Sequence, residues 1–440
     1  MEESFLRQQL LEAIPAFMAR VAPGALLRTH LAEHPLPSSF RPGSLLSLGK
    51  AAGAMAETLA DLLSISPRNT LSILPEGYPR PPASFPVQEG AHPLPDPRSL
   101  EAFHKIQAFI ATIPKDDSVV VALSGGSSSL VAAPIPPVTL EDKIRVTRSL
   151  MEAGAPIATI NALRLHLSKF KGGGLAQMLS PHPHLTFVLS DIPGPGAPLV
   201  GSSPMVAIPR NGPQILEEIN LFLSPEMIPP TVRQLLEALP PQNLSPKTFP
   251  ESPLRVVGSS ASLIEALTDT LMKISEISPL PLHSLTTELR GEAREAGRVL
   301  ASIISWGSQR AEARHQGSVW AASGETTVTL TGTPSGKGGR TLELALALAL
   351  SLTPVPALVL SLASDGFDGN SGAAGALIPT SFFSSSRRCI EGELALRSHD
   401  SGGFLGRHGL TMKTGPSGTN VNDLLMVIVF PASLSQRSGS

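Results

Sequence analysis

The chain is poor in the residues on which several classes of protein depend. Its single cysteine, Cys389, excludes an internal disulfide and a zinc site built on cysteines, and it fits a reducing cytoplasm. Two tryptophans and one tyrosine leave few aromatic platforms on which bases or sugars could stack. Charged residues make up only 16% of the chain and the formal net charge is −2, so no basic stripe indicates a nucleic-acid partner. We therefore expect a cytoplasmic protein that binds no nucleic acid.

Motifs of the common enzyme classes are also missing. No GxGxxG segment follows an apolar run, and neither HExxH nor GxSxG occurs, so dinucleotide sites, zinc hydrolases and serine hydrolases have no local support. Residues 332–338 suggest a Walker loop, but the spacing is one residue short. Gly338 also stands where that loop needs Ser or Thr.

No segment is predicted to cross a membrane. The apolar stretch 342–364 is interrupted by Pro354 and Pro356, which leaves each half too short for a spanning helix. We expect a buried helix, a proline turn and then a buried strand. The N-terminus is acidic and then amphipathic, unlike a signal peptide.

Short apolar runs alternate with helical patterns along the 440 residues. The runs cover 118–123, 185–190, 254–259, 356–362 and 424–430, and helical spacing occurs at 140–154 and 262–277. Continuous apolar strands are typical of parallel sheets that helices cover on both faces. The pattern therefore predicts an α/β protein with a doubly wound architecture.

A second, smaller domain is expected to be mixed α/β, because residues 319–332 alternate with threonine as antiparallel strands do. The proline-rich segment 225–253 predicts a linker. We accordingly place an N-terminal domain at 1–245 and a C-terminal domain at 252–440.

Polar loops follow several of the predicted strands, where open α/β sheets bind ligands. Residues 124–129 read SGGSSS, which suits close approach of the backbone to an anion or, equally, a plain tight turn. Asp191 follows the apolar run 185–190. It is a candidate metal ligand or general base, although an aspartate at such a place is more commonly a turn residue. Asp365 and Asp368 form an acidic turn that suits Mg²⁺ bound partly through phosphate oxygens, with a solvated turn as the alternative.

Two cations and one further loop complete the candidate residues. Lys50 lies in a strand-to-helix turn, where an ordinary solvated lysine is the simpler interpretation. Arg340 precedes the long apolar helix, a position that disfavours a cation unless an anion binds nearby. Residues 414–423 form a dense polar loop before the last strand, either a site or a surface turn.

Nine segments, in this order along the chain, resemble the type-II glycerate kinases. They are 49–56, 90–96, 124–134, 161–173, 189–194, 323–332, 336–350, 364–376 and 414–424. In that family an N-terminal Rossmann-like domain precedes a C-terminal domain known as MOFRL. The resemblance implies ATP-dependent phosphorylation of D-glycerate to 2-phospho-D-glycerate with Mg²⁺, in a cleft between the two domains of a monomer or homodimer.

The resemblance also implies roles for individual residues. Lys50, Arg340 and Asp191 match its catalytic positions, and Asp191, Asp365 and Asp368 are the candidate metal ligands. The residues implied to bind substrate or phosphate are Ser124, Gly125, Gly126, Ser127, Ser128, Lys171, Glu325, Thr414, Gly415, Ser417, Gly418, Thr419, Asn420 and Asn422.

The chain departs from the family at several charged or polar positions. They are Gly174, Pro195, Gly196, Pro204, Thr341, Leu342 and Gly372. Together these changes remove charge from the expected site. Two alternatives stay open. One is a hydroxypyruvate reductase, a label that members of this family have carried. The other is a weakened member that only binds nucleotide or hydroxy acid.

Overall fold

The computed structural model describes residues 3–242, 253–309, 316–330, 336–353 and 355–431. The chain forms two compact units. The N-terminal unit comprises Leu27–Ser190 and Gly196–Val257. The C-terminal unit comprises the described residues of Met1–Leu26, Asp191–Pro195 and Gly258–Ser440. Two segments placed by sequence in the first domain thus join the second unit, because they pack on its helices and loops.

The N-terminal unit is built on a six-stranded sheet in the order β3-β2-β1-β4-β5-β6. The strands are β1 Pro42–Leu48, β2 Thr70–Pro75, β3 Val87–Gly90, β4 Ser118–Ser124, β5 His184–Leu189 and β6 Leu254–Gly258. The first five in the sheet order pair in parallel. This confirms the doubly wound architecture and places a topological switch point between β1 and β4.

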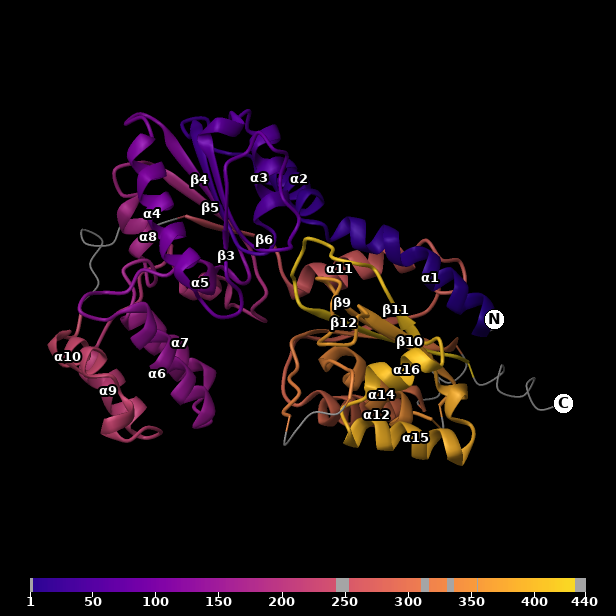
Figure 1. Ribbon diagram of the computed structural model, residues 1–440. Coiled ribbons are helices and arrows are strands. Elements are labelled where there is room, and N and C mark those ends of the chain that lie inside the picture. The colour runs from indigo at the N-terminus through magenta and orange to yellow at the C-terminus, as the bar shows by residue number, and fades with distance from the viewer. Residues whose placement is uncertain (1–2, 243–252, 310–315, 331–335, 354, 432–440) are drawn as a thin grey trace. The chain divides into compact units, whose positions relative to one another are not determined.

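Helices cover both faces of this sheet, with α3 on one side and α4 and α8 on the other (Figure 1). The helices and 3₁₀ turns around the sheet are α2 Pro23–Glu33, α3 Ala52–Leu62, η1 Pro67–Asn69, α4 Pro97–Thr112, α5 Ser127–Leu130, α8 Gly174–Met178 and η2 Ala197–Ser202. Every residue of β2, β4 and β5 is buried, as the apolar runs predicted for β4 and β5. Two-sided coverage by helices explains that burial.

Four further helices of this unit stand apart from the sheet and form a core of their own (Figure 1). They are α6 Leu140–Glu152, α7 Ile157–His166, α9 Gly212–Asn220 and α10 Pro230–Ala238, with the 3₁₀ turn η3 Pro225–Met227. The predicted linker 225–253 thus begins with η3 and α10, and its residues 243–252 lie outside the described residues.

The C-terminal unit contains a second six-stranded sheet, in the order β11-β10-β9-β12-β8-β7. Its strands are β7 Leu282–Leu289, β8 Ser318–Gly324, β9 Ala357–Ala363, β10 Gly375–Pro379, β11 Thr411–Met412 and β12 Asp423–Val429. Only β7 and β8 are parallel; the other pairs are antiparallel. The mixed α/β prediction is confirmed. The expectation that buried runs mark parallel strands is wrong for β9, because helices on both faces bury antiparallel strands equally well.

The strand predicted at 319–332 is shorter than expected. Strand β8 ends at Gly324, and Thr327 forms only an isolated bridge with Glu292. Residues 331–332, like most of the Walker-like segment 332–338, lie outside the described residues.

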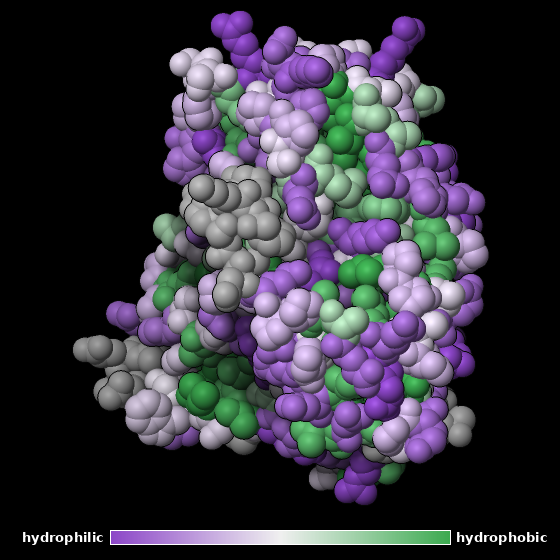
Figure 2. Space-filling model, turned by 90° about the vertical axis from the view of Figure 1, so that its left-hand side faces the viewer, coloured by the Kyte–Doolittle hydropathy of each residue, from purple (hydrophilic) through white to green (hydrophobic). Residues whose placement is uncertain are grey.

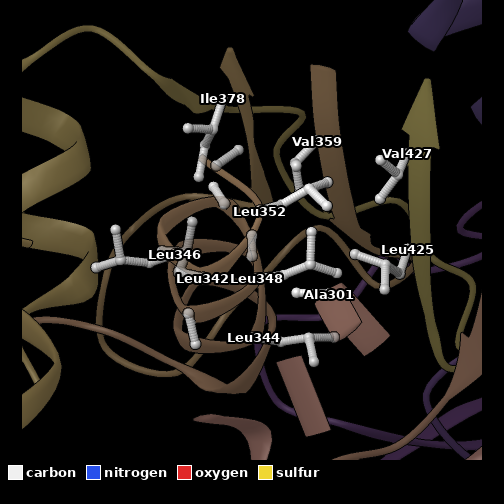
Figure 3. Packing of buried hydrophobic residues seen from close by; sticks show 14 of the residues in the cluster. Ala301, Leu342, Leu344, Leu346, Leu348, Leu352, Val359, Ile378, Leu425 and Val427 are labelled. Carbon is white, nitrogen blue, oxygen red and sulfur yellow. The ribbon is translucent and has the colours of Figure 1, made fainter. Parts of the chain in front are cut away.

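Helix α14 (Arg340–Ser351) is the centre of the C-terminal unit's core. Figure 3 shows its leucines pointing to several sides, with Leu348 toward Val359 of β9 and Leu425 of β12. A helix that is apolar all round is buried on all sides, so the sequence interpretation of a buried helix is confirmed. The other helices and turns are α1 Glu3–Arg20, α11 Ser260–Leu271, α12 Ala293–Ser308, η4 Thr380–Phe383, α15 Ser386–Arg397 and α16 Ser401–Arg407.

The described part of the chain contains no single helix that is long and apolar enough to cross a membrane, although α1 and α2 pass that test as a bent pair. On the face turned to the viewer in Figure 2, hydrophobic residues form separate patches between hydrophilic ones. Such scattered apolar residues are ordinary on protein surfaces.

Candidate active site

The turn after β1 places Lys50 at the switch point of the N-terminal sheet. Gly49 precedes it with φ of +118°, and a Cβ there would lie 2.3 Å from Ser124 Oγ. Only glycine fits this close approach. The Lys50 amide donates to Gly125 O at 2.9 Å, and the Ala51 amide to Ser124 Oγ at 3.0 Å. The Ser124 hydroxyl therefore holds this turn against the loop after β4.

Two predicted residues, Gly126 in the loop after β4 and Lys50, lie close to a histidine that sequence reasoning did not assign. A Cβ on Gly126 would lie 3.1 Å from His92 Cδ2 and 3.2 Å from Lys50 Cγ. The Lys50 ammonium lies 6.0 Å from the centre of the Tyr78 ring. His92 is exposed overall, yet desolvation and then the charge of Lys50 lower its pKa to about 4. His92 is therefore neutral at physiological pH beside a cationic lysine.

Lys171 binds the same loop from its other end. Its side chain is 1% exposed, and Nζ donates to Ser128 O at 2.6 Å and to Ser128 Oγ at 2.5 Å. Ser128 Oγ lies 3.0 Å from Ser202 Oγ. Burial, then the charges of Lys143 and Arg164, lower the pKa of Lys171 well below its usual value. The loop that sequence predicted for phosphate binding is thus flanked by two lysines.

One departure from the family has a steric explanation. A Cβ on Gly174 would lie 2.0 Å from Lys169 O, so the basic residue expected there does not fit this backbone. Thr341 and Leu342 are fully buried in the first turn of α14, where they serve packing.

Arg340, the first residue of α14, is held between two carboxylates of the C-terminal unit. Its Nε donates to Asp423 Oδ2 at 2.6 Å and one Nη to Asp423 Oδ1 at 3.4 Å, while the other Nη pairs with Glu325. Burial would by itself lower the pKa of Arg340, but Asp423 and then Glu325 raise it. Burial raises the pKa of Asp423 to about 6, against the effect of Arg340. Both partners are therefore charged at neutral pH. Asp423 ends the predicted polar loop 414–423, but sequence reasoning gave it no role of its own.

The two carboxylates of the acidic turn after β9, Asp365 and Asp368, make different contacts. Asp368 is 2% exposed, and its two oxygens accept from the backbone amides of Thr341 and Leu342, each at 2.9 Å. It thereby caps α14. Asp365 is half-buried, accepts from the Phe367 amide at 3.0 Å, and its charge contributes to the raised pKa of Arg340. Metal binding by either residue stays a prediction. Both oxygens of Asp368 already accept hydrogen bonds from the first turn of α14.

The polar loop 414–422 lies against that acidic turn. A Cβ on Gly366 would lie 1.9 Å from Gly415 O, and the Ser417 amide donates to Asp365 O at 3.2 Å. Three predicted side chains hold the loop in place. Their bonds are Ser417 Oγ to Ser364 O at 2.5 Å, Thr419 Oγ1 to Val21 O at 3.1 Å and Asn422 Nδ2 to Ser260 Oγ at 2.6 Å. Thr414 and Gly415 are exposed, whereas Gly418 is buried.

Asp191 belongs to the same unit as Arg340. Its Oδ2 accepts from Asn420 Nδ2 at 3.2 Å, which joins two residues that sequence predicted separately. Pro193 O accepts from Arg290 at 2.8 Å. The 191–195 segment is therefore fixed to the C-terminal unit by polar contacts. No group of three or more metal-binding side chains occurs within the described ranges.

Comparison with known proteins gives consistent matches. Residues 9–237 match a domain of unknown function, DUF4147, and residues 318–423 match the MOFRL family. The glycerate 2-kinase of Pyrococcus horikoshii is 30% identical over 389 residues, covering 88% of this chain and 87% of the relative. An Agrobacterium vitis protein, provisionally named hydroxypyruvate reductase, is 32% identical and covers 88% of this chain and 98% of the relative.

A solved structure extends the match to the fold. The crystal structure of a glycerate kinase from Thermotoga maritima has a TM-score of 0.82 and 27% identity, covering 97% of this chain and 100% of that one. The sequence resemblance is thereby confirmed. The chain belongs to the glycerate kinase family in which a DUF4147 domain is combined with a MOFRL domain.

Proposed function

We propose that this protein transfers the terminal phosphoryl group of ATP to the 2-hydroxyl group of D-glycerate, giving 2-phospho-D-glycerate. The observation that carries the proposal is the family relationship, because a relative named glycerate 2-kinase aligns over 88% of this chain. The cytoplasmic location and a monomeric or homodimeric state stay predictions.

The side chains suit phosphoryl transfer, which asks a protein mainly for positioning and charge neutralisation. Lys50 lies beside the Gly126 loop, and among the described residues three of the five N–H groups of Arg340 are directed at Asp423 and Glu325. These two cations would bind the substrate carboxylate and the phosphoryl group, with their division left open. Asp191 would orient the substrate hydroxyl and accept its proton.

The acidic residues fit a Mg²⁺ ion that enters with the nucleotide. Mg²⁺ in such sites takes one or two carboxylates together with phosphate oxygens. Asp191 and Asp365 would supply those carboxylates, since the oxygens of Asp368 already cap α14. When bound, the ion would neutralise charge on the phosphates.

The reductase alternative rests on the name of the Agrobacterium vitis relative. A nicotinamide site in this kind of sheet uses GxGxxG in the turn after β1. Here that turn reads Gly49-Lys50-Ala51-Ala52-Gly53, which lacks the second glycine and carries a lysine. The kinase is therefore the better supported function.

The test is ADP release by the purified chain with ATP, Mg²⁺ and D-glycerate, with the phosphorylated hydroxyl assigned by NMR. We expect 2-phosphoglycerate. Lys50→Met and Arg340→Gln should each lower kcat/KM by roughly tenfold or more. Exposed cations supply the controls: Lys115→Met and Arg397→Gln should leave the rate unchanged.

Three outcomes would contradict the proposal. ADP release that does not rise above background across a panel of small hydroxy acids, with nucleotide still bound, would favour the binding-only alternative. Oxidation of NADH with hydroxypyruvate would favour the reductase. Near-normal turnover in either substituted protein would remove that residue from the site.

A further inference from the structure

The N-terminal unit contains a cavity of about 760 Å³. Helices α6 and α7 form one side of it, and the other side is formed by residues 92–95, the loop after β4 and Lys171. This volume is typical of sites for small organic ligands, which measure about 300–1,000 Å³. A three-carbon hydroxy acid would fill only a small part of it. The cavity therefore fits a larger ligand than D-glycerate.

Two buried lysines and a half-buried arginine line this cavity. Lys143 is 4% exposed and Lys171 1%, and burial lowers the pKa of Arg164. Burial and then the charge of Arg164 lower the pKa of Lys143 to about 8. None of the three forms an ion pair with any carboxylate in the described part of the chain.

Such a cluster is unfavourable in an empty protein, because buried charges are normally paired. Arg148 adds a further cation to the lining, and Glu152 is its one carboxylate. The imbalance of charge indicates a ligand with several negative charges. One carboxylate, as on glycerate, would balance only one of these three cations.

The remaining wall of the cavity is largely apolar. It includes Ile144, Ile160 and, toward solvent, Met151 and Ile157. Met151 is 55% and Ile157 66% exposed, so both offer apolar surface that a flat ring could cover. A molecule with a polyanionic end and an apolar, planar end matches both walls. A nucleoside triphosphate has this chemistry.

We propose that this cavity is the nucleotide subsite, with the polyphosphate on Lys143, Arg164 and Lys171 and the base against Met151 and Ile157. Gly126 lines the cavity and also contacts the Lys50 side chain, so the phosphate end lies next to Lys50. The inference rests on the proposed function, because a kinase requires a nucleotide as its phosphoryl donor.

The first test is the affinity of the full chain for ATP in the absence of D-glycerate, measured by calorimetry. Lys143→Met keeps the volume and removes the charge. The loss of one charge-assisted contact should weaken ATP binding about 10- to 100-fold. Arg145→Met is the matched control on the same helix: its side chain is 61% exposed, lies outside the cavity lining and should leave affinity unchanged.

A thermal unfolding scan separates ligand binding from folding. Without nucleotide, Lys143→Met should unfold at the same or a higher temperature than the original protein, because a buried, unpaired charge is removed. At one fixed ATP concentration, Lys143→Met should gain clearly less thermal stability than the original protein and Arg145→Met. A lower unfolding temperature of Lys143→Met without nucleotide would assign Lys143 a structural role and overturn the inference.

The second test separates the two ends of the ligand. Inorganic tripolyphosphate should compete with ATP in the original protein and bind about tenfold or more weakly to Lys143→Met. Ile157→Asp should weaken ATP binding while leaving tripolyphosphate binding largely intact. Leu221→Asp, at an apolar position that is 80% exposed in the same unit, is its control.

The outcomes distinguish this inference from the proposed function. If D-glycerate is phosphorylated but Lys143→Met and Ile157→Asp bind ATP normally, the nucleotide lies elsewhere and the inference fails alone. If Lys143→Met changes only the KM for D-glycerate, the cavity holds the acid and the inference also fails. If ATP binding depends on Lys143 but no hydroxy acid is phosphorylated, the subsite stands and the kinase proposal fails.

Discussion

Replacing Asp423 by asparagine tests how Arg340 is held. Asp423 is the first residue of β12, is 7% exposed and receives two of the guanidinium's hydrogen bonds, at 2.6 and 3.4 Å. The variant Asp423→Asn keeps the shape and removes the charge. Arg340 would then be paired only with Glu325, whose side chain is 41% exposed. A largely buried guanidinium would lose its buried counter-charge.

The magnitude follows from the burial of the pair. Removing one partner of a buried ion pair costs about 3–5 kcal/mol, and Glu325 offsets part of this, so we expect a loss of about 3 kcal/mol. Both tryptophans of the chain, Trp306 and Trp320, lie in the C-terminal unit. Urea unfolding followed by their fluorescence therefore reports on the unit that contains the pair. The surface variant Glu393→Gln, from an exposed pair with Arg298, should cost less than about 1 kcal/mol.

A double replacement tests whether Arg340 and Asp423 contribute to stability as a pair. Arg340→Met combined with Asp423→Leu removes both charges and should recover most of the stability that Asp423→Asn loses. The same protein should show no phosphorylation, since the proposed substrate contact is gone. A loss below about 0.5 kcal/mol in Asp423→Asn, or a double variant less stable than it, would refute the coupling.

Two further predictions concern other charged groups. Asp368→Ala should lower stability by about 2 kcal/mol, because the first amides of α14 lose their acceptors, and it should leave the Mg²⁺ dependence of activity unchanged; a raised Mg²⁺ requirement would instead assign Asp368 to the metal. Lys143 titrates near pH 8 when folded and near 10.5 when unfolded, so the unfolded state holds more protons between these values and stability should rise with pH. Over that range the original protein should gain about 3 kcal/mol relative to Lys143→Met, measured by urea unfolding. Parallel curves would refute the prediction. Both proteins keep the other ionisable groups that line the cavity, which are His92, Arg148, Glu152, Arg164 and Lys171.

Sequence patterns predicted about half of the described strands, and the direction predicted for β9 was wrong. The apolar runs became β4, β5, β6, β9 and β12, and helices α6 and α11 formed where the helical spacing was found. Burial on both faces makes a strand continuously apolar, and parallel and antiparallel strands satisfy that condition alike. The pairing of β9 with β10 and β12 depends on contacts between residues far apart in the chain, which a local pattern does not contain.

Likewise, sequence could indicate some residues of the candidate site but not others. Lys50 and Arg340 could be singled out because each lies in a segment with unusual local composition. Lys171 was predicted only because its segment, 161–173, resembles the glycerate kinases. Asp423 was included in the polar loop 414–423, but its pairing with Arg340 could not be predicted, since the two residues lie 83 positions apart in the chain. Lys143 had no local signal either, because a lysine on an amphipathic helix is normally solvated, and only the packing around α6 buries it.

The pairing of Arg340 bears on how charge would be neutralised during phosphoryl transfer. With Asp423, Glu325 and Asp365 around it, the neighbourhood of Arg340 carries more negative than positive charge. Arg340 would therefore act through its two remaining, directed N–H groups more than through its charge. The charge of the nucleotide phosphates would then require other partners, and the buried cations Lys143 and Lys171 are unpaired with carboxylates among the described residues. A metal ion bound to the carboxylates and lysine side chains bound to the phosphates would share the neutralisation of charge. That neutralisation would then not depend only on the acidic residues that the family has and this chain lacks.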